Sequence, residues 1–138
     1  MDTISPERRS ENMRNIRGKN TKPELIVRTA VFAMGYRYRL HSAHLPGKPD
    51  LVFPSLHKAI FVHGCFWHKH SRPGCKIARL PKSNSGYWAD KLTRNVARDV
   101  LRRAELKKAG WRTLIIWECQ TRSIAAQTRR IKRFLEKG

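Results

Sequence analysis

The chain has 138 residues, of which 40% are hydrophobic, and this is enough for one domain with its own core and excludes a disordered basic tail. Its 30 Lys and Arg against 10 Asp and Glu give a net charge of +20, which predicts a polyanion partner. A nucleic acid is favoured as this partner over an anionic membrane surface, because no basic amphipathic helix dominates the sequence. It is also favoured over the alternative that the charge only keeps the protein soluble. No apolar run of transmembrane length and no signal-peptide segment is found, so we expect a cytoplasmic protein without a membrane partner.

Residues 1–20 are basic and polar, with Met13 and Ile16 at helical spacing, and they predict a short, mobile helix. A second helix is predicted to follow, because Thr21 can cap its start and Glu24 stands three residues later, as in a capping box. That capping role would account for Glu24 without any catalytic function. The start and end signals of this helix are Thr21, Pro23, Glu24 and Gly35.

Alternating and apolar runs predict three strands, over residues 36–40, 50–53 and 58–62. A loop over 44–49 joins the first two strands, and a turn over 54–57 joins the last two. These last two form a hairpin in which Asp50 starts one arm and His63 follows the other. Because opposite ends of antiparallel neighbours lie side by side, we expect Asp50 and His63 to share a site.

The second half of the chain predicts a long helix, a buried strand and a final basic helix. Their expected ranges are 87–109, 111–117 and 123–137, after an irregular stretch over 64–86. The apolar stripe of the long helix contains Trp88, Leu92, Val96, Val100 and Leu106. Asp99 lies on the edge of that stripe, and Gly110 closes the helix. This order of elements predicts an α/β fold, with a mixed β-sheet flanked by helices on both faces.

Cysteine and histidine side chains are concentrated between residues 60 and 75. In a reducing compartment the three cysteines of this chain are not expected to form a disulfide framework. Three cysteines and one histidine make the ligand set of a closed structural zinc site. The set would be Cys65, His70, Cys75 and Cys119, with His63 or His68 as alternatives to His70. The competing interpretation is three unrelated thiols and a surface histidine.

Two carboxylates in this basic chain are candidates for chemistry. Asp50 is either a turn-forming residue or, with His63 and His68 at the other end of the hairpin, part of a Mg²⁺ site with a histidine acid or base. Asp99 needs a partner, because burying a lone carboxylate is costly, and an imidazole is a good candidate.

Several large aromatic residues lie close to these polar residues in the sequence. Phe66 and Trp67 stand between the histidines, and they either anchor the core or wedge between DNA base pairs. Trp88 opens the long helix beside a tyrosine. Trp111 and Trp117 are interpreted as core anchors.

Taken together, these residues resemble the very-short-patch repair (Vsr) DNA mismatch endonucleases over almost the whole chain. The matching stretches are SENMRNIRGKNTKPE, LPGKPDLVF, IFVHGCFWHKH, YWADKLTRNVARD and GWRTLIIWEC, and HGCFWH is highly specific. The resemblance implies a restriction-endonuclease-like core related to the PD-(D/E)xK nucleases. Asp50 would supply the aspartate of the PD pair, and Phe61-Val62-His63 would replace the usual ExK.

The resemblance also implies a role for each candidate residue. Asp50 and the main-chain carbonyl of Val62 would hold a catalytic Mg²⁺. His68 would be the acid or base, oriented by Asp99, with His63 and Glu24 supporting the site. The structural Zn²⁺ would be held by Cys65, His70, Cys75 and Cys119, and the DNA-intercalating residues would be Phe66, Trp67 and Trp88.

The chain departs from the family pattern at four places. Val62 stands where the best-known members carry threonine, so a hydroxyl is lost but a carbonyl ligand is kept. The loop between His70 and Cys75 is two residues longer than expected, which bears on Cys75 as a zinc ligand. Lys69 replaces a histidine, and the C-terminal extension is short.

The function implied is a Mg²⁺-dependent DNA repair endonuclease that nicks one strand 5′ to the thymine of a T:G mismatch, a product of 5-methylcytosine deamination. We expect a monomeric, nucleoid-associated protein that binds double-stranded DNA, partly through residues 1–20, with downstream mismatch-repair proteins as further partners. One alternative is a nuclease of the same fold that cuts unmismatched DNA at a specific sequence. The other is a zinc-stabilised DNA-binding module without catalysis.

Overall fold

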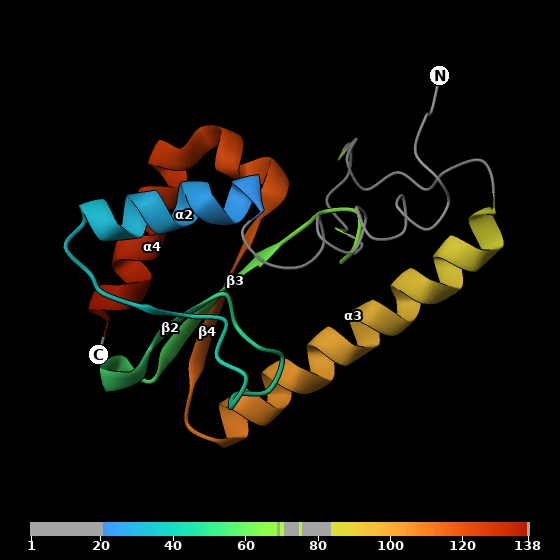
Figure 1. Ribbon diagram of the computed structural model, residues 1–138, viewed down its shortest axis with the longest axis horizontal. Helices are drawn as coiled ribbons and strands as arrows, with labels where there is room; N and C mark the ends of the chain where they lie inside the picture. The colour runs from blue at the N-terminus through green and yellow to red at the C-terminus, as the bar shows by residue number, and fades with distance from the viewer. Residues whose placement is uncertain (1–20, 69, 71–74, 76–83, 138) are drawn as a thin grey trace.

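The computed structural model describes residues 21–68, 70, 75 and 84–137, and the helix predicted within residues 1–20 lies outside them. These described residues form three helices and a four-stranded sheet, joined by loops and by two short 3₁₀ turns (Figure 1). In chain order the elements are α2 (Lys22–Ala33), β1 (Arg39–Leu40), β2 (Leu51–Phe53), η1 (Pro54–Leu56), β3 (Lys58–His63), α3 (Ser85–Lys108), β4 (Arg112–Trp117), η3 (Glu118–Ser123) and α4 (Ile124–Glu136).

The sheet is mixed, as predicted, with the strand order β1-β2-β3-β4. The first three strands are antiparallel neighbours, and β3 pairs with β4 in parallel. The parallel pair needs a crossover connection, and α3 lies within it. Because β3 and β4 run side by side from Lys58 opposite Arg112 to His63 opposite Trp117, they end at the same edge of the sheet.

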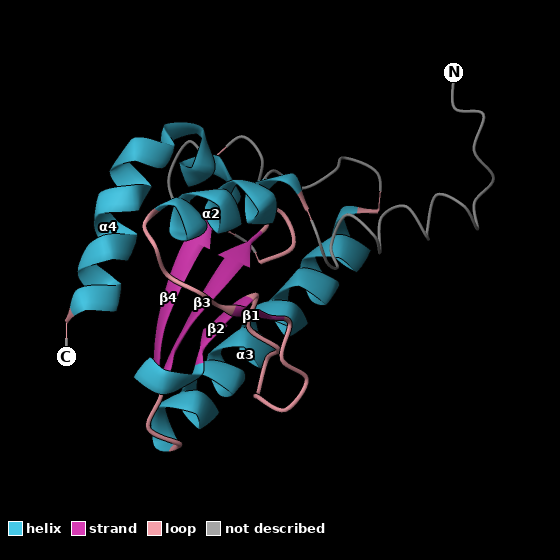
Figure 2. Ribbon diagram, turned by 60° about the vertical axis from the view of Figure 1, so that its left-hand side comes forward, coloured by secondary structure: helices cyan, strands magenta, loops and turns pink. Residues whose placement is uncertain are grey.

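Helices cover both faces of the sheet, which confirms the expected layering (Figure 2). α2 and α4 pack on one face, and α3 crosses the other (Figures 1 and 2). The main hydrophobic core lies under α2 and α4 and consists of Val27, Val31, Leu51, Phe53, Ile60, Ile116, Ile131 and Leu135. Successive residues of a strand point to opposite faces, so β3 serves both layers.

The strand predicted over residues 36–40 is wrong in most of its length, since β1 contains only Arg39 and Leu40. Tyr36 and Tyr38 alternate as a strand would, but their rings pack edge-on against Phe53, with centroids 6.4 and 6.5 Å away. The alternation therefore reflects contact of two aromatic residues with the core, without a neighbouring strand to pair with.

The loop that leads to Asp50 is packed against α3. Gly47 has φ +77°, and a Cβ atom there would lie 3.0 Å from Arg102 Cβ and 3.3 Å from the Phe61 ring. Only glycine combines this backbone conformation with such a close approach. Pro49 is fully buried, so the residue before Asp50 is fixed by packing.

The apolar stripe predicted for α3 is wrong at Val100, which is 54% exposed. Leu92 and Leu106 are buried, and Asn95 is buried with them. The buried face turns past Val100 because 3.6 residues make one helical turn, and this places Asp99 toward the sheet. The last helix, Ile124–Glu136, agrees with the predicted range of 123–137 to within one residue at each end, and η3 lies between it and β4.

A buried lysine fastens α4 to the sheet. Lys58, the first residue of β3, is 4% exposed, and its Nζ donates to the carbonyl oxygens of Phe134 at 2.7 Å and Leu135 at 3.1 Å and to that of Lys137. These carbonyls at the helix end have no partner within the helix, so the ammonium group satisfies them. Within the described part of the chain, no helix is long and apolar enough to cross a membrane.

Candidate active site and metal centre

The polar residues of the candidate site gather where β3 ends. Val62 packs toward the core under α2 and α4, whereas the next residue, His63, is buried on the side of α3. This alternation divides the site into two groups of ligand-type side chains, one on each side of the β3 backbone. Glu24, His41 and Asp50 form one group, and His63, His68 and Asp99 form the other.

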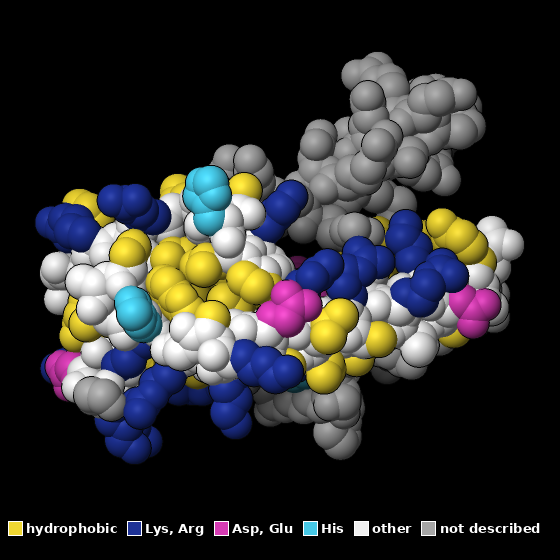
Figure 3. Space-filling model, turned by 90° about the horizontal axis from the view of Figure 1, so that it is seen from below, with side chains coloured by type: hydrophobic (Ala, Val, Ile, Leu, Met, Phe, Trp, Pro, Cys, Tyr) yellow, Lys and Arg dark blue, Asp and Glu magenta, His cyan; other side chains and the backbone are white. Residues whose placement is uncertain are grey.

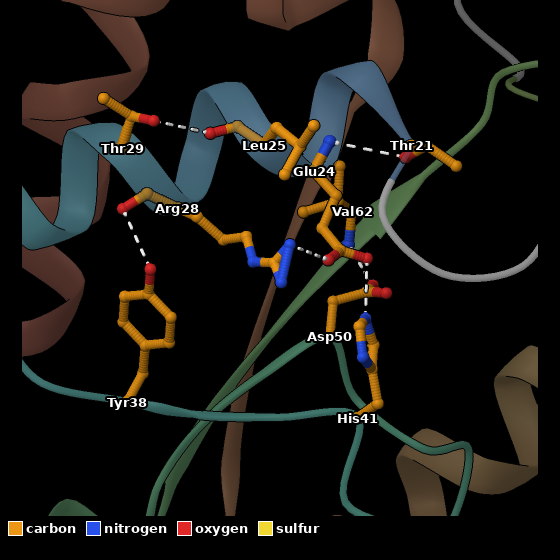
Figure 4. A network of polar contacts seen from close by, with 9 residues as sticks. All are labelled: Thr21, Glu24, Leu25, Arg28, Thr29, Tyr38, His41, Asp50 and Val62. Atoms are coloured by element: carbon orange, nitrogen blue, oxygen red, sulfur yellow. Dashed lines mark hydrogen bonds and ion pairs between the residues drawn. The ribbon is translucent and has the colours of Figure 1, made fainter.

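Asp50 is held by the strand beside it. Its Oδ2 accepts a hydrogen bond from the Val62 main-chain N–H at 2.7 Å (Figure 4). Burial raises the pKa of Asp50 to about 7, and the nearby Glu24 carboxylate adds to this, against the lowering effect of the Val62 N–H. Two carboxylates placed together in this way favour a shared proton or a bound cation.

The carboxylate of Glu24 does more than cap α2. Thr21 Oγ1 accepts from the Glu24 N–H at 3.4 Å, which is half of the predicted capping box. The Glu24 side chain, however, is 1% exposed and reaches His41 Nε2 at 2.8 Å and Arg28 Nη1 at 3.3 Å (Figure 4). The capping interpretation is therefore insufficient, and Glu24 lies in the site beside Asp50.

His41 and Arg28 are site residues that the sequence reasoning missed. His41 follows β1 in the left-handed backbone region, with φ +46°, and its N–H donates to the Asp50 carbonyl at 3.2 Å. Neither residue lies in a motif that marks a metal site or a catalytic residue. The sequence signal for His41 is its position just before the loop that leads to Asp50. This position alone does not predict a contact between His41 and the carboxylates of Glu24 and Asp50.

The hairpin brings Asp50 and His63 to the same end of the sheet, as predicted, but their side chains belong to different groups of ligand atoms. Among the described residues, the candidate ligand groups place Asp50 with Glu24 and His41, and His63 with His68 and Asp99. The hairpin brings the two positions to the same end of the sheet, but Asp50 precedes β2 and its carboxylate turns toward α2. The sequence thus predicted that the two positions lie close together, but it carried no prediction of the direction of their side chains.

On the other side of β3, two histidines and an aspartate form a connected row. The rings of His63 and His68 stack with centroids 3.7 Å apart, and Asp99 Oδ2 lies 2.5 Å from His68 Nδ1. Burial lowers the pKa of His63 to about 2, helped by His68 and Arg103. His63 is therefore neutral at ordinary pH, and among the described residues its Nδ1 has no hydrogen-bond partner.

The ends of the parallel strands also build a cysteine and histidine cluster. His63 is opposite Trp117, so Cys65 and Cys119 stand two residues beyond paired positions on neighbouring strands. Their sulfur atoms, a nitrogen of His70 and the Cys75 sulfur all lie within 4.8 Å of one another. The longer loop between His70 and Cys75 does not separate Cys75 from the other three residues.

The surroundings of this cluster suit a metal. Burial raises the pKa of the Cys65 thiol to about 12, so a bound cation is needed to hold it as a thiolate. The Cys119 N–H donates to Cys65 Sγ at 3.4 Å, and Glu118 Oε1 accepts from the Cys65 N–H at 3.3 Å. Three sulfurs and one imidazole nitrogen are the donor set of a closed structural zinc site.

Trp117 is half-buried and lies within the site, so its interpretation as a plain core anchor is wrong. Its ring stacks on His70 with centroids 4.1 Å apart and meets His63 edge-on at 5.2 Å. Trp111 is also half-buried and stacks on His57 with centroids 5.2 Å apart.

The three candidate wedge residues contact one another. The ring centroids of Phe66 and Trp67 are 5.1 Å apart, and those of Phe66 and Trp88 are 5.5 Å apart, both with edge-on geometry. Lys91 Nζ lies 5.5 Å from the Trp88 ring and 5.7 Å from the Trp67 ring. Trp67 is only 9% exposed, so Phe66 and Trp88 are the more accessible members.

The surface of the protein is strongly basic. On the face seen in Figure 3, Lys and Arg side chains are spread over both halves, with few acidic side chains among them. A surface of this kind attracts the phosphate backbone of a nucleic acid without reading its sequence.

Comparison with known proteins finds similar sequences that extend over most of this chain. A sequence profile described as DNA mismatch endonuclease Vsr matches residues 1–73. The chain is 47% identical over 135 residues to the type II nicking enzyme V.XorIIP of Xanthomonas oryzae pv. oryzae, covering 98% of this chain and 97% of that protein. It is 38% identical over 134 residues to the type II nicking enzyme V.NmeAIP of Neisseria meningitidis (97% and 94% covered). Over 114 residues it is 39% identical to the DNA mismatch endonuclease Vsr of Escherichia coli K12 (83% and 71% covered).

Proposed function

This chain belongs to the Vsr family of DNA mismatch endonucleases, and from that membership we propose that it nicks one strand of duplex DNA 5′ to the thymine of a T:G mismatch. The family is one of DNA endonucleases with a restriction-endonuclease-like fold, and the mixed sheet between helices agrees with it. Membership of an endonuclease family argues against a DNA-binding module without catalysis.

We assign the catalytic cation, Mg²⁺ in this proposal, to Asp50 and the main-chain carbonyl of Val62. The N–H and C=O of one strand residue point to the same side, and the Val62 N–H already points at Asp50. The carboxylate and the carbonyl oxygen are hard ligands of the kind that Mg²⁺ takes. When bound, the ion would polarise the scissile phosphate and stabilise the charge that develops on it.

His68 is assigned as the acid or base, and Asp99 as the residue that orients it. The Asp99 carboxylate contacts His68 Nδ1, which leaves Nε2 as the nitrogen that exchanges a proton with the substrate or with water. The neutral, buried His63 ring covers one face of His68 and fixes the plane of the imidazole. His63 is held by β3 and Asp99 by α3, which supports a preorganised position for His68 between them.

Recognition of the mismatch is assigned to the aromatic group formed by Phe66, Trp67 and Trp88. Inserting such rings between base pairs costs a few kcal/mol per unstacked step, and a mismatched pair opens at lower cost than a matched one. The zinc ion assigned to Cys65, His70, Cys75 and Cys119 would fix this segment beside the acid or base. The distance between the wedge and the scissile phosphate would then be set by the fold.

The observation that carries the proposal is that Asp50, anchored to Val62, and the His68–Asp99 pair lie at the same end of β3 in a member of this family. The test is a nicking assay on duplexes that differ only in a central T:G or T:A pair, with and without Mg²⁺. We expect cleavage 5′ to the mismatched thymine that requires Mg²⁺ and disappears in Asp50→Asn.

The names of two relatives favour a second candidate. Both are called type II nicking enzymes, so cleavage tied to a particular sequence is a specific alternative. Equal rates on T:A and T:G duplexes of one sequence, with no cleavage of other sequences, would replace the mismatch proposal by this one.

A further inference from the structure

Glu24, His41 and Asp50 form the group on the α2 side of β3. The imidazole of His41 belongs neither to the sequence motifs quoted above nor to the proposed Mg²⁺ ligands. His41 Nε2 lies 2.8 Å from Glu24 Oε1, and one ligand atom each of Glu24, His41 and Asp50 lies within 4.8 Å of the others. Figure 4 shows the His41 ring directed at the two carboxylates. This is the only imidazole in that group among the residues the structure describes.

Glu24 is buried, His41 and Asp50 are partly buried, and the group is short of hydrogen-bond donors. The side chains of Glu24 and His41 are 1% and 14% exposed. Within the described part of the chain, Glu24 Oε2 receives no hydrogen bond, and its charged neighbour is Arg28 Nη1 at 3.3 Å. Two carboxylates that face each other away from water therefore have less positive charge beside them than they can accommodate.

The spacing fits neighbouring ligands of a single cation. With metal–ligand distances of about 2.1 Å, adjacent ligands of an octahedral ion stand about 3 Å apart. The separation of His41 Nε2 and Glu24 Oε1 is close to that value.

We propose that His41 Nε2 and Glu24 join Asp50 and the Val62 carbonyl as direct ligands of the proposed cation, and that the His41 nitrogen makes the site select Mn²⁺ over Mg²⁺. The inference rests on the proposed function only in taking Asp50 and the Val62 carbonyl as ligands. Mg²⁺ prefers an all-oxygen environment and keeps its waters, whereas first-row transition ions accept imidazole together with carboxylate. The nitrogen thus adds affinity for Mn²⁺ that it cannot add for Mg²⁺.

The test is binding of Mn²⁺ alone to the zinc-loaded full chain, followed through the electron paramagnetic resonance signal of free Mn²⁺, with Mg²⁺ as competitor. The wild type is expected to bind Mn²⁺ at least about tenfold more tightly than Mg²⁺. His41→Gln keeps a donor toward Glu24, and it should weaken Mn²⁺ binding about tenfold while changing Mg²⁺ binding less than about threefold. His44→Gln, an exposed histidine in the following loop, is the matched control and should change neither.

Pulsed resonance of bound Mn²⁺ gives a direct readout of the nitrogen. Coupling to a directly bound ¹⁴N nucleus is expected in the wild type and in His44→Gln, and it should be absent in His41→Gln. Coupling that persists in His41→Gln, or an unchanged ratio of Mn²⁺ to Mg²⁺ affinity, overturns the proposal.

Asp50→Asn separates this inference from the proposed function. In one outcome, Asp50→Asn binds neither Mn²⁺ nor Mg²⁺, while His41→Gln keeps the wild-type ratio of Mn²⁺ to Mg²⁺ affinity. His41 is then not a ligand, and the proposed function still stands. Undiminished Mn²⁺ binding in Asp50→Asn means that the cation lies elsewhere, and it overturns both.

Discussion

The imidazole rings of His63 and His68 stack face to face, 3.7 Å between centroids and 6° between planes. Burial holds His63 neutral, whereas His68 contacts Asp99. The neutral His63 ring therefore fixes the plane of the His68 imidazole, and Asp99 fixes its Nδ1.

Asp99→Asn should slow nicking about 100-fold or more, because an amide cannot stabilise the protonated ring or hold the same tautomer. The single-turnover rate on a T:G duplex measures this. Asp90→Asn, an exposed position on the same helix, is the control and should behave as the wild type. A rate for Asp99→Asn within about threefold of the wild type would remove Asp99 from the mechanism.

The dependence of stability on pH should show two opposing contributions in magnesium-free buffer. The pKa of His63 is lowered from 6.5 to about 2, so the unfolded chain alone takes up this proton below pH 6.5, and stability falls as the pH falls. The pKa of Asp50 is raised from 3.8 to about 7, so the folded chain alone keeps this proton, and stability falls as the pH rises through that window.

Where the two windows overlap, the contributions of His63 and Asp50 should largely cancel. Asp50→Asn should then show stability that rises with pH, and His63→Phe stability that falls with pH, each by up to about 1 kcal/mol per pH unit. Denaturant unfolding at a series of pH values is the measurement. Parallel curves for the wild type and both variants would show that neither pKa is shifted as described.

Asp50→Asn should make the protein more stable and inactive at the same time. An asparagine at position 50 keeps the acceptor for the Val62 N–H and offers a donor to Glu24 in place of a second negative charge. At pH 8 without Mg²⁺, we expect a gain of about 1–3 kcal/mol in the free energy of unfolding. Added Mg²⁺ should stabilise the wild type by mass action but leave this variant unchanged, and the opposite pattern would rule out Asp50 as a ligand.

Removal of any one ligand from the cysteine and histidine cluster should release the zinc. Elemental analysis is expected to find about one zinc per wild-type chain and substantially less in Cys75→Ser, Cys119→Ser or His70→Ala. Each loss should lower the unfolding temperature, because metal binding contributes to folding. His57→Ala serves as the control outside the cluster, and a fully loaded Cys75→Ser would exclude Cys75 as the fourth ligand.

Phe66→Ala and Trp88→Ala should reduce the preference for T:G over T:A duplexes, since these are the more accessible rings of the wedge. The base analogue 2-aminopurine, placed next to the mismatch, should brighten when the wild type unstacks it. It should brighten less with either variant. Trp111→Phe changes a ring that stacks on His57 instead, and it should retain the full response.

The layered fold could be predicted because clear patterns of apolar residues mark the helices and strands that pack into the layers. The apolar run before His63, the long helix and the run before Cys119 gave β3, α3 and β4, and the parallel ends of those strands bring Cys65 and Cys119 together. The prediction failed where an apolar or alternating pattern had a cause other than the one assumed. Tyr36 and Tyr38 alternate because both touch Phe53, and Val100 is apolar on an exposed face.

The contacts of Glu24 and His41 could not be predicted for a different reason. They depend on the left-handed backbone conformation of His41 after β1 and on the direction of the Asp50 side chain just before β2. Neither feature has a signature in the sequence. A capping residue explained Glu24 locally and therefore hid its tertiary role. Side-chain direction at strand ends is set by packing, which local patterns do not encode.

β3 is fixed at both of its ends, with consequences for how the gene can vary. Its first residue, Lys58, is bonded to the end of α4, and its last, His63, stacks on His68. A one-residue insertion or deletion between them would send every following side chain to the opposite face. Changes in the length of this strand should therefore be eliminated by selection.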